Sequence, residues 1–127
     1  MVDALGNPIN LLISAGNEAD ISHAEPLFEP ILQTLSINGT IVNADKGYDS
    51  KAFVDFLESH GAIANVPSRK SNKVQRECDW WMYKERYLVE CFWNKIKQFR
   101  RVATRYEKLA KTFLGVVYLA AILVLVK

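Results

Sequence analysis

The sequence is poor in cysteine and histidine, and this scarcity argues against several common kinds of site. Its 127 residues include two cysteines and two histidines. Cys78 and Cys91 do not have the spacing of metal ligands, and neither lies near a histidine in the chain, so a zinc site of neighbouring ligands is not expected. The two cysteines are predicted to be free thiols in a reducing compartment, which favours a cytoplasmic location.

Net charge is also small. The formal net charge is +2, so any affinity for nucleic acid must come from local clusters of cations rather than from total charge. The first cluster contains Arg69, Lys70, Lys73 and Arg76. The second cluster contains Lys95, Lys97, Arg100, Arg101, Arg105, Lys108 and Lys111. Such clusters are typical of surfaces that contact phosphates, although a solvated loop is the alternative for the first one.

Targeting and membrane-spanning signals are lacking as well. No basic and then apolar run opens the chain, so no signal peptide is predicted. The apolar stretch 112–127 is shorter than the roughly 20 residues that cross a bilayer. We expect this stretch to form a helix buried against a sheet, with no membrane partner; a membrane-associated protein is the alternative.

The order of turn signals and apolar runs predicts an α/β fold. The length predicts one domain over residues 1–127, and a hydrophobic share of 50% is enough for a core. We expect a hairpin around residues 6–8 with a strand at 9–14, and strands at 40–44 and 62–66. Helices are expected at 20–35 (kinked or broken at Pro30), at 51–60, from about residue 80 to 106 as one long amphipathic helix, and at the apolar end of the chain. The segment 67–79 has no periodicity and is predicted to be a polar, basic loop.

Four polar residues stand at helical spacing in the long helix: Tyr83, Arg86, Glu90 and Lys97. At 100° per residue they fall within an arc of about 60° on one face. The arc continues through Asn94, Arg101, Arg105 and Lys108, so Glu90 is its only acid. The opposite stripe contains Leu88, Phe92, Ile96, Phe99, Ala103 and Tyr106, which suits a buried core. One carboxylate among cations suggests a metal beside a phosphate chain.

Asp45 is the candidate partner of Glu90. It follows the predicted strand 40–44, and sites in α/β sheets form at the carboxyl ends of parallel strands. An Asp before Gly47 is usually a turn residue, but two converging carboxylates can hold Mg²⁺ or Mn²⁺. Two such ions about 4 Å apart can activate water or a 3′-hydroxyl and stabilise the leaving oxygen of a phosphodiester.

Other polar and aromatic residues have simpler interpretations. Asp49 is expected to cap the helix that starts at residue 51. Trp80, Trp81 and Trp93 could stack on unpaired bases near a cleaved end. Packing in the core or at its rim is at least as good an interpretation for Trp80 and Trp81, and Trp93, near the polar arc, is the better candidate for DNA. His60, beside Gly61, is expected at a helix C-terminus.

The motifs resemble those of a known family. Asp45-Lys-Gly-Tyr-Asp-Ser, followed by Tyr-x2-Arg-x3-Glu-x6-Lys from Tyr83 to Lys97, resembles the DDE transposases of bacterial insertion sequences. The segments 2–8 and 16–21 are similar to that family's β-hairpin and following helix, so the resemblance covers essentially the whole chain. It implies a ribonuclease H-like mixed sheet flanked by helices, in which Asp45 and Glu90 are the second and third metal-binding acids.

The resemblance also implies binding partners, and the sequence departs from the family in one respect. Tyr83, Arg86 and Lys97, with Trp93 and Arg101, would grip transposon ends and target DNA, and a second transposase chain is a further partner. The family's first catalytic aspartate lies on a first, central strand that is missing here, and Asp3 does not replace it because it stands beside the hairpin turn. We therefore expect the carboxy-terminal part of a transposase, either a decayed copy or the downstream product of a frameshifted element, that is inactive alone. A non-catalytic remnant that binds DNA or a transposase is the alternative.

Overall fold

The computed structural model describes residues 1–104 and 108–126. Arg105 of the predicted polar arc and Tyr106 of the predicted core stripe lie outside the described residues. The chain divides into two compact units, one formed by Ser14–Arg86 and the other by Met1–Ile13 together with Tyr87–Lys127. We call them the sheet unit and the helical unit and describe each by itself.

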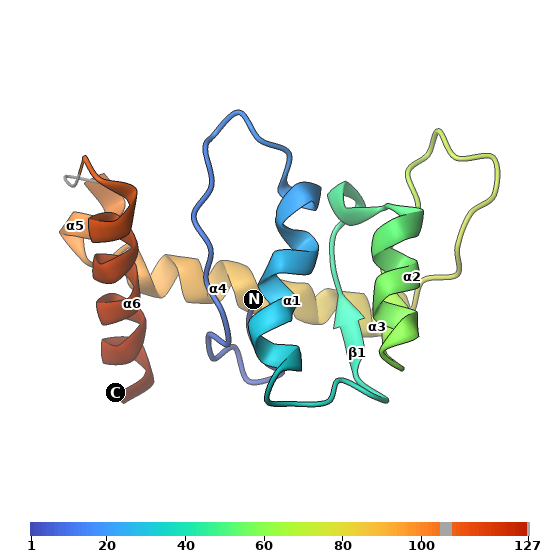
Figure 1. The fold of residues 1–127 in the computed structure, drawn as a ribbon, viewed down its shortest axis with the longest axis horizontal. Coiled ribbons are helices and arrows are strands. Elements are labelled where there is room, and N and C mark those ends of the chain that lie inside the picture. Colours follow the sequence, from blue (N-terminus) through green and yellow to red (C-terminus); the bar gives the residue numbers. More distant parts are fainter. Residues whose placement is uncertain (105–107, 127) are drawn as a thin grey trace. The chain divides into compact units, whose positions relative to one another are not determined.

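The sheet unit holds a parallel pair of strands joined through a helix. Its elements are η1 (Asp20–His23), α1 (Ala24–Leu32), β1 (Ile41–Asn43), η2 (Lys46–Tyr48), α2 (Lys51–Ser59), β2 (Ile63–Asn65), α3 (Trp80–Tyr83) and η3 (Lys84–Arg86). The register pairs Ile41 with Ile63 and Asn43 with Asn65. In Figure 1, β1 lies between α1 and α2. A parallel pair needs a crossover of this kind, and α2 provides it.

Local signals explain the boundaries of α2. The Ser50 side chain caps its start by accepting a hydrogen bond from the Phe53 N–H at 3.5 Å. Gly61 follows its end with φ of 76°, a conformation that favours glycine. Between these points Phe53 and Leu57 face inward, 3% and 0% exposed, and Phe53 packs near the Phe28 ring of α1 at a centroid distance of 6.1 Å. Apolar residues at helical spacing therefore join α1 and α2.

The helical unit contains α4 (Tyr87–Ile96), α5 (Arg100–Thr104) and α6 (Ala110–Val126). Its core comprises Leu11, Phe92, Ile96, Val102, Val117, Ala120 and Ala121. The Tyr118 hydroxyl donates to the Leu11 carbonyl at 3.1 Å and so ties the N-terminal segment to α6. Among the described residues, no helix is both long and apolar enough to span a bilayer.

The α/β class is confirmed: the described residues form helices and a two-stranded parallel sheet. The predicted strands 40–44 and 62–66 and the helix 51–60 are confirmed by β1, β2 and α2, with ends that differ by one residue or so. The predicted strand at 9–14 is wrong. Within the described residues this segment pairs with no strand, and the hairpin is reduced to a single antiparallel bridge between Val2 and Pro8.

The single long helix is also wrong. The segment 80–104 is divided into α3, the 3₁₀ turn η3, α4 and α5, so a uniform 100° per residue does not apply to Tyr83, Arg86, Glu90 and Lys97. After Ile96 the backbone bonds shorten to three-residue steps, since the N–H of Phe99 donates to the Ile96 carbonyl. This tighter turn brings Phe99 and Val102 onto the core of the helical unit.

The apolar terminal helix is confirmed as α6, but its predicted packing against a sheet is not what its own unit shows. There α6 contacts α4 and α5, and the described residues of that unit include no strand. Val117, Ala120 and Ala121 are its buried residues. Because alanine side chains are small, neighbouring helices can approach this side of α6 closely. Packing on this one side is enough to bury the three residues.

Candidate active site and DNA-binding groove

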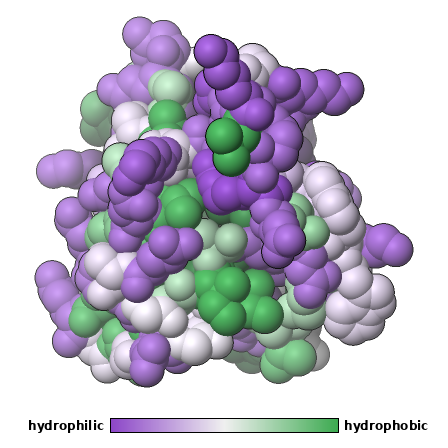
Figure 2. Space-filling view, turned by 90° about the vertical axis from the view of Figure 1, so that its right-hand side faces the viewer, coloured by the Kyte–Doolittle hydropathy of each residue, from purple (hydrophilic) through white to green (hydrophobic). Residues whose placement is uncertain are grey.

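An open groove of about 1050 Å³ lies at the carboxyl ends of β1 and β2 in the sheet unit. Residues that follow β1, residues that follow β2 and residues of α3 and η3 line it. Its charged residues are the cations Lys46, Arg69, Lys70 and Arg86 and the acids Asp20 and Asp45. Figure 2 views the side of α2 and the loop 67–79, where long hydrophilic side chains project over much of the surface. Among the charged residues that line the groove, cations therefore outnumber acids.

Asp45 stands at the start of η2, two residues after β1 ends. Its Oδ1 accepts a hydrogen bond from the Gly47 N–H at 2.7 Å, which fixes the carboxylate at the turn. A Cβ placed on Gly47 would lie 2.8 Å from the same oxygen, closer than Cβ contacts in proteins allow. A larger residue at position 47 would therefore displace the Asp45 carboxylate from its present position.

Two carboxylates act on Tyr48 beside the groove. Burial is the largest cause that raises the pKa of Tyr48, and the negative charges of Asp20 and Asp45 raise it further. Asp20, which was not predicted as a site residue, thus lies near the same turn as Asp45. Within the described part of the chain, no three His, Cys, Asp or Glu side chains gather closely enough to form a metal site.

Asp49 does not have the role that was predicted for it. Ser50 caps α2, and Asp49 instead organises the loop 67–79, with a side chain that is 1% exposed. It accepts hydrogen bonds from the Arg69 N–H at 2.8 Å and the Asn72 side-chain amide at 2.6 Å, and it forms an ion pair with Arg76. The prediction failed because helix capping is judged from neighbouring residues, whereas these partners stand 20 to 27 residues away.

This anchoring places Arg69 beside the Asp45 turn. The Arg69 guanidinium donates to the carbonyls of Lys46 and Gly47 at 3.4 Å each, long distances that indicate weak bonds. The first basic cluster of the sequence is therefore a held loop at the groove, and Arg69 and Lys70 both line it. A basic loop in this place can contact phosphates.

Asn65 fixes the start of α3 to the end of the sheet. It is 4% exposed and every group of its amide has a partner: Nδ2 donates to Asn43 Oδ1 at 2.7 Å and to the Asp79 carbonyl at 3.0 Å. The Asp79 N–H in turn donates to Asn65 Oδ1 at 2.8 Å. A buried amide satisfied in this way specifies one arrangement of the chain. It fixes Asp79, and Trp80 is the next residue.

The predicted residues Tyr83 and Arg86 line the same groove as Asp45. The Arg86 guanidinium carbon lies 5.5 Å from the centroid of the Tyr83 ring, a distance suited to a cation–π contact. Trp80 meets Tyr83 edge-on at a centroid distance of 5.4 Å. Of the two interpretations of Trp80 and Trp81, packing in the core is wrong, since they are 61% and 72% exposed.

The remaining predicted residues belong to the helical unit. Glu90 and Trp93 lie on α4, Lys97 follows its last residue and Arg101 lies on α5. All four are exposed, with Trp93 at 37%, and the Trp93 ring contacts Phe92 at 5.6 Å. Because Asp45 and Glu90 are in different units, their convergence on one metal site stays a prediction.

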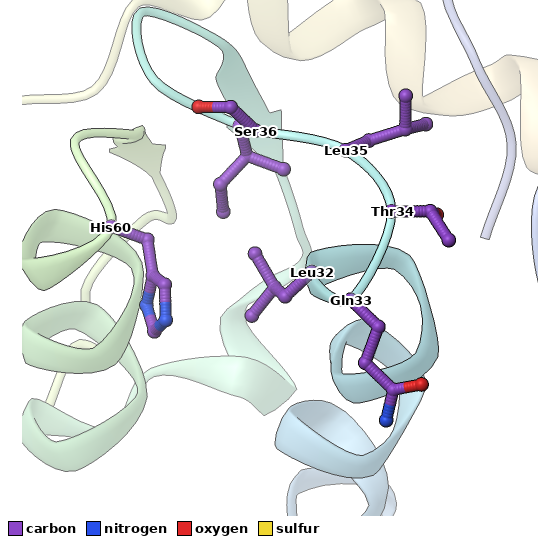
Figure 3. Close-up of a pocket in the computed structure, with 7 residues that line it drawn as sticks. Leu32, Gln33, Thr34, Leu35, Ser36 and His60 are labelled. Atoms are coloured by element: carbon purple, nitrogen blue, oxygen red, sulfur yellow. The ribbon is translucent and has the colours of Figure 1, made fainter.

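A second pocket of the sheet unit, about 400 Å³, lies between the segment 32–37 and His60. Figure 3 shows the His60 ring on one side and the residues that follow α1 on the other. His60 is at the C-terminal end of α2, as predicted, and its Nδ1 lies 2.8 Å from the Phe56 carbonyl. This bond holds one nitrogen of the imidazole to its own helix.

Comparisons with known proteins bear on the family of the chain. Residues 42–127 match the family described as the transposase DDE domain. A protein of Brucella ovis, named as a candidate transposase for insertion sequence element IS6501, is 34% identical over 125 residues, which cover 98% of this chain and 92% of the relative. A similarly named protein for element IS402 of Burkholderia cepacia is 27% identical over 116 residues, which cover 87% of this chain and 53% of the relative. The chain thus spans about half the length of the second relative. No solved structure matches.

The fold and the groove define an α/β protein with an acidic residue and several cations at the carboxyl ends of parallel strands. The matches identify its family more closely: the chain belongs to the DDE transposases of insertion sequences. The resemblance inferred from the motifs is therefore confirmed.

Proposed function

We propose that the chain contributes to the cutting and joining of DNA phosphodiesters at the ends of an insertion sequence, and that it supplies Asp45 and Glu90 as two of the catalytic, metal-binding acids. The observation that carries the proposal is the groove itself. Asp45, Tyr83 and Arg86, which are distant in the sequence, line one cationic groove at the carboxyl ends of the strands. A carboxylate beside cations is what phosphodiester chemistry at a bound metal requires.

The proposal includes the arrangement of the active domain. Residues 1–127 would form part of a ribonuclease H-like catalytic domain in which β1 and β2 belong to a larger mixed sheet. Asp45 and Glu90 offer the oxygen ligands that Mg²⁺ and Mn²⁺ prefer, and Asp45 is held at the rim of the groove by Gly47. We propose a second transposase chain as a partner.

The side chains of this protein would bind and orient DNA. Mg²⁺, when bound, would supply an activated oxygen nucleophile and stabilise the leaving oxygen. Arg86 would hold the phosphate near Asp45, with its guanidinium positioned over the Tyr83 ring. Lys97, Arg101 and Trp93, exposed in the helical unit, would contact DNA outside the groove.

Metal binding provides the first test. We expect the purified chain to bind Mn²⁺, measured by electron paramagnetic resonance, and we expect Asp45→Asn and Glu90→Gln each to weaken binding by about tenfold or more. Asp55→Asn is the matched control, because Asp55 is an exposed acid on α2 that does not line the groove. Equal Mn²⁺ affinity in all four proteins would refute the assignment of Asp45 and Glu90.

DNA binding and nicking provide the second test. Binding to the terminal inverted repeats should weaken as the salt concentration rises. The double variant Lys97→Ala, Arg101→Ala should bind DNA more weakly, and its affinity should depend less steeply on salt concentration. Asp45 and Glu90 are two acids where the family's site has three, and two acids bind a pair of metal ions more weakly than three. We therefore expect no nicking of DNA by the 127-residue chain with Mn²⁺. Nicking that Glu90→Gln abolishes would show that the site is more complete than proposed.

A further inference from the structure

The segment that carries Tyr83 and Arg86 into the groove has little hydrophobic anchoring. No residue of α3 or η3 is fully buried, whereas α2 is held in the same unit by the buried side chains of Phe53 and Leu57. The segment 66–79, which leads into α3, has neither helix nor strand. Burial of an apolar face is what usually fixes a helix in a protein. The place of Tyr83 and Arg86 must therefore depend on polar contacts.

The side chain of Asn65 provides such contacts. Asn65 is the last residue of β2 and stands in register with Asn43, the last residue of β1. Its Nδ2 donates both to Asn43 Oδ1 and to the carbonyl of Asp79, and its Oδ1 accepts from the Asp79 N–H. Asp79 in turn caps α3, since its Oδ1 accepts from the N–H groups of Trp81 and Met82. One amide therefore joins the ends of both strands to the start of α3.

These bonds connect residues that line different parts of the groove. Asp45 follows Asn43 closely in the chain and lines the groove after β1. On the other side, the Asp79 carbonyl that accepts from Asn65 also accepts from the Tyr83 N–H at 2.8 Å, and Tyr83 lines the groove as well. A short series of hydrogen bonds thus runs from the end of β1 through Asn65 and Asp79 to Tyr83.

Burial makes this connection specific. Asn65 is 4% exposed, and both hydrogens of its Nδ2 have acceptors. Any other placement of α3 would leave a buried amide without partners, which costs free energy because water cannot replace them. Since the guanidinium of Arg86 lies over the Tyr83 ring, the same amide also determines where that cation stands.

We propose that Asn65 is a positioning residue of the groove, whose amide places Tyr83 and Arg86 relative to Asp45 and so sets the affinity of the groove for DNA; the proposal rests on the proposed function that the chain acts on DNA. Asn65 is not among the residues that line the groove, so it acts through those that are. Loss of its bonds weakens the DNA contact made by Arg86 and leaves the contact made by Lys97, in the helical unit, as it was.

The first experiment compares two replacements of the exposed residue Asp79 in the full chain. Binding to a labelled DNA duplex is measured by fluorescence anisotropy without Mg²⁺, so that metal binding does not contribute. Asp79→Ala and Asp79→Pro both remove the carboxylate that caps α3, but only proline also removes the N–H that donates to Asn65. The φ of Asp79 is −74°, which a proline ring allows. We expect Asp79→Pro to bind DNA about 3- to 30-fold more weakly than Asp79→Ala.

The second experiment removes the amide itself. Asn65→Leu keeps a side chain of similar volume without its hydrogen bonds, and Val54→Ala is the matched control, because Val54 is a buried residue of α2 that does not line the groove. Both variants should unfold at lower urea concentrations, but only Asn65→Leu should lose DNA affinity in buffer without urea, again by about 3- to 30-fold. This loss should shrink in an Arg86→Ala background and persist in a Lys97→Ala background.

Three results would overturn the proposal. They are equal affinities of Asp79→Pro and Asp79→Ala, equal affinities of Asn65→Leu and Val54→Ala, and a loss from Asn65→Leu that is the same in both backgrounds. A wild-type chain with no affinity for DNA would refute the proposed function and this inference together. Any of the three results with a wild-type chain that binds DNA would refute the inference alone.

Discussion

The carboxylate of Asp49 and the guanidinium of Arg76 form an ion pair whose acidic side chain is 1% exposed and whose basic side chain is 32% exposed. The pair joins the segment before α2 to the far end of the loop 67–79. With the Arg69 and Asn72 bonds to the same carboxylate, it closes that loop onto the Asp45 turn. The position of the basic loop thus depends on one buried acid.

Replacing Asp49 should cost stability as well as DNA binding. In Asp49→Asn the charge that Arg76 meets is lost, and we expect the free energy of unfolding to fall by about 2 kcal/mol, measured in urea by circular dichroism. The affinity for DNA should fall with it, since Arg69 is no longer held. Asp55→Asn removes the exposed pair with Lys51, which is open to solvent, and should change neither quantity measurably. Similar losses in both variants would contradict this account of Asp49.

Gly47→Ala should disturb the site more than the fold. The added Cβ would lie 2.8 Å from Asp45 Oδ1, too close for an ordinary contact, and the flexible side chain of Asp45 can rotate away at little cost to stability. We expect a nearly unchanged melting temperature and a loss of Mn²⁺ affinity of about 10- to 100-fold, as for other supports of metal ligands. Unaltered Mn²⁺ affinity would mean that the bond from the Gly47 N–H does not position Asp45.

Two glycines with the same backbone conformation allow strain and crowding to be separated. Gly39 and Gly61 both have φ of 76°, but a Cβ on Gly39 meets open space whereas a Cβ on Gly61 collides with the Asn38 side chain. We expect Gly39→Ala to cost about 1 kcal/mol of unfolding free energy from the backbone alone, and Gly61→Ala to cost about 2 to 3 kcal/mol. Adding Asn38→Ala should restore part of the loss in Gly61→Ala and none of the loss in Gly39→Ala. Equal costs for the two glycines would contradict the predicted collision.

Asp3 makes stability depend on pH. Burial, the largest single influence, raises the pKa of Asp3, but hydrogen bonds from Asn7, Leu5 and Gly6 together outweigh it, so the pKa lies below the ordinary value of 3.8. A lowered folded-state pKa means that the carboxylate stabilises the fold above pH 3.8 and that this contribution is lost as the pH falls through the folded value. Asp3→Asn should therefore be less stable than wild type at neutral pH, with a difference that vanishes in acid. A difference independent of pH, in urea unfolding, would contradict this.

The sequence predicted best where its signals were local. β1, α2 and β2 are short apolar runs bounded by turn residues, and the caps at Ser50 and Gly61 depend on residues within a few positions. The helix from residue 80 onward was predicted as one because the apolar spacing persists through it. The 3₁₀ turn at 84–86 and the turn after Ile96 interrupt this helix, and spacing along the chain does not record such changes in backbone hydrogen bonding.

The same distinction applies to the site. Asp45, Tyr83, Arg86 and Glu90 were recognised from their order and spacing, and three of them line one groove. Asp49, Asn65 and Gly47 were not recognised as supports, because the partners of the first two are 14 to 27 residues away and the third acts through a close approach in space. The exposure of Trp80 was left open for a related reason: burial depends on which elements pack together, which the sequence does not show.

By itself the sequence determined the family, the acid that follows β1 and the residue types that suit phosphodiester chemistry, since each of these depends on the order of residues. Only the tertiary structure decided that the loop 67–79 folds onto the Asp45 turn and that Trp80 stands exposed beside it. The physical reason is that both outcomes depend on buried polar groups, the Asp49 carboxylate and the Asn65 amide, which must find partners far along the chain once they leave water.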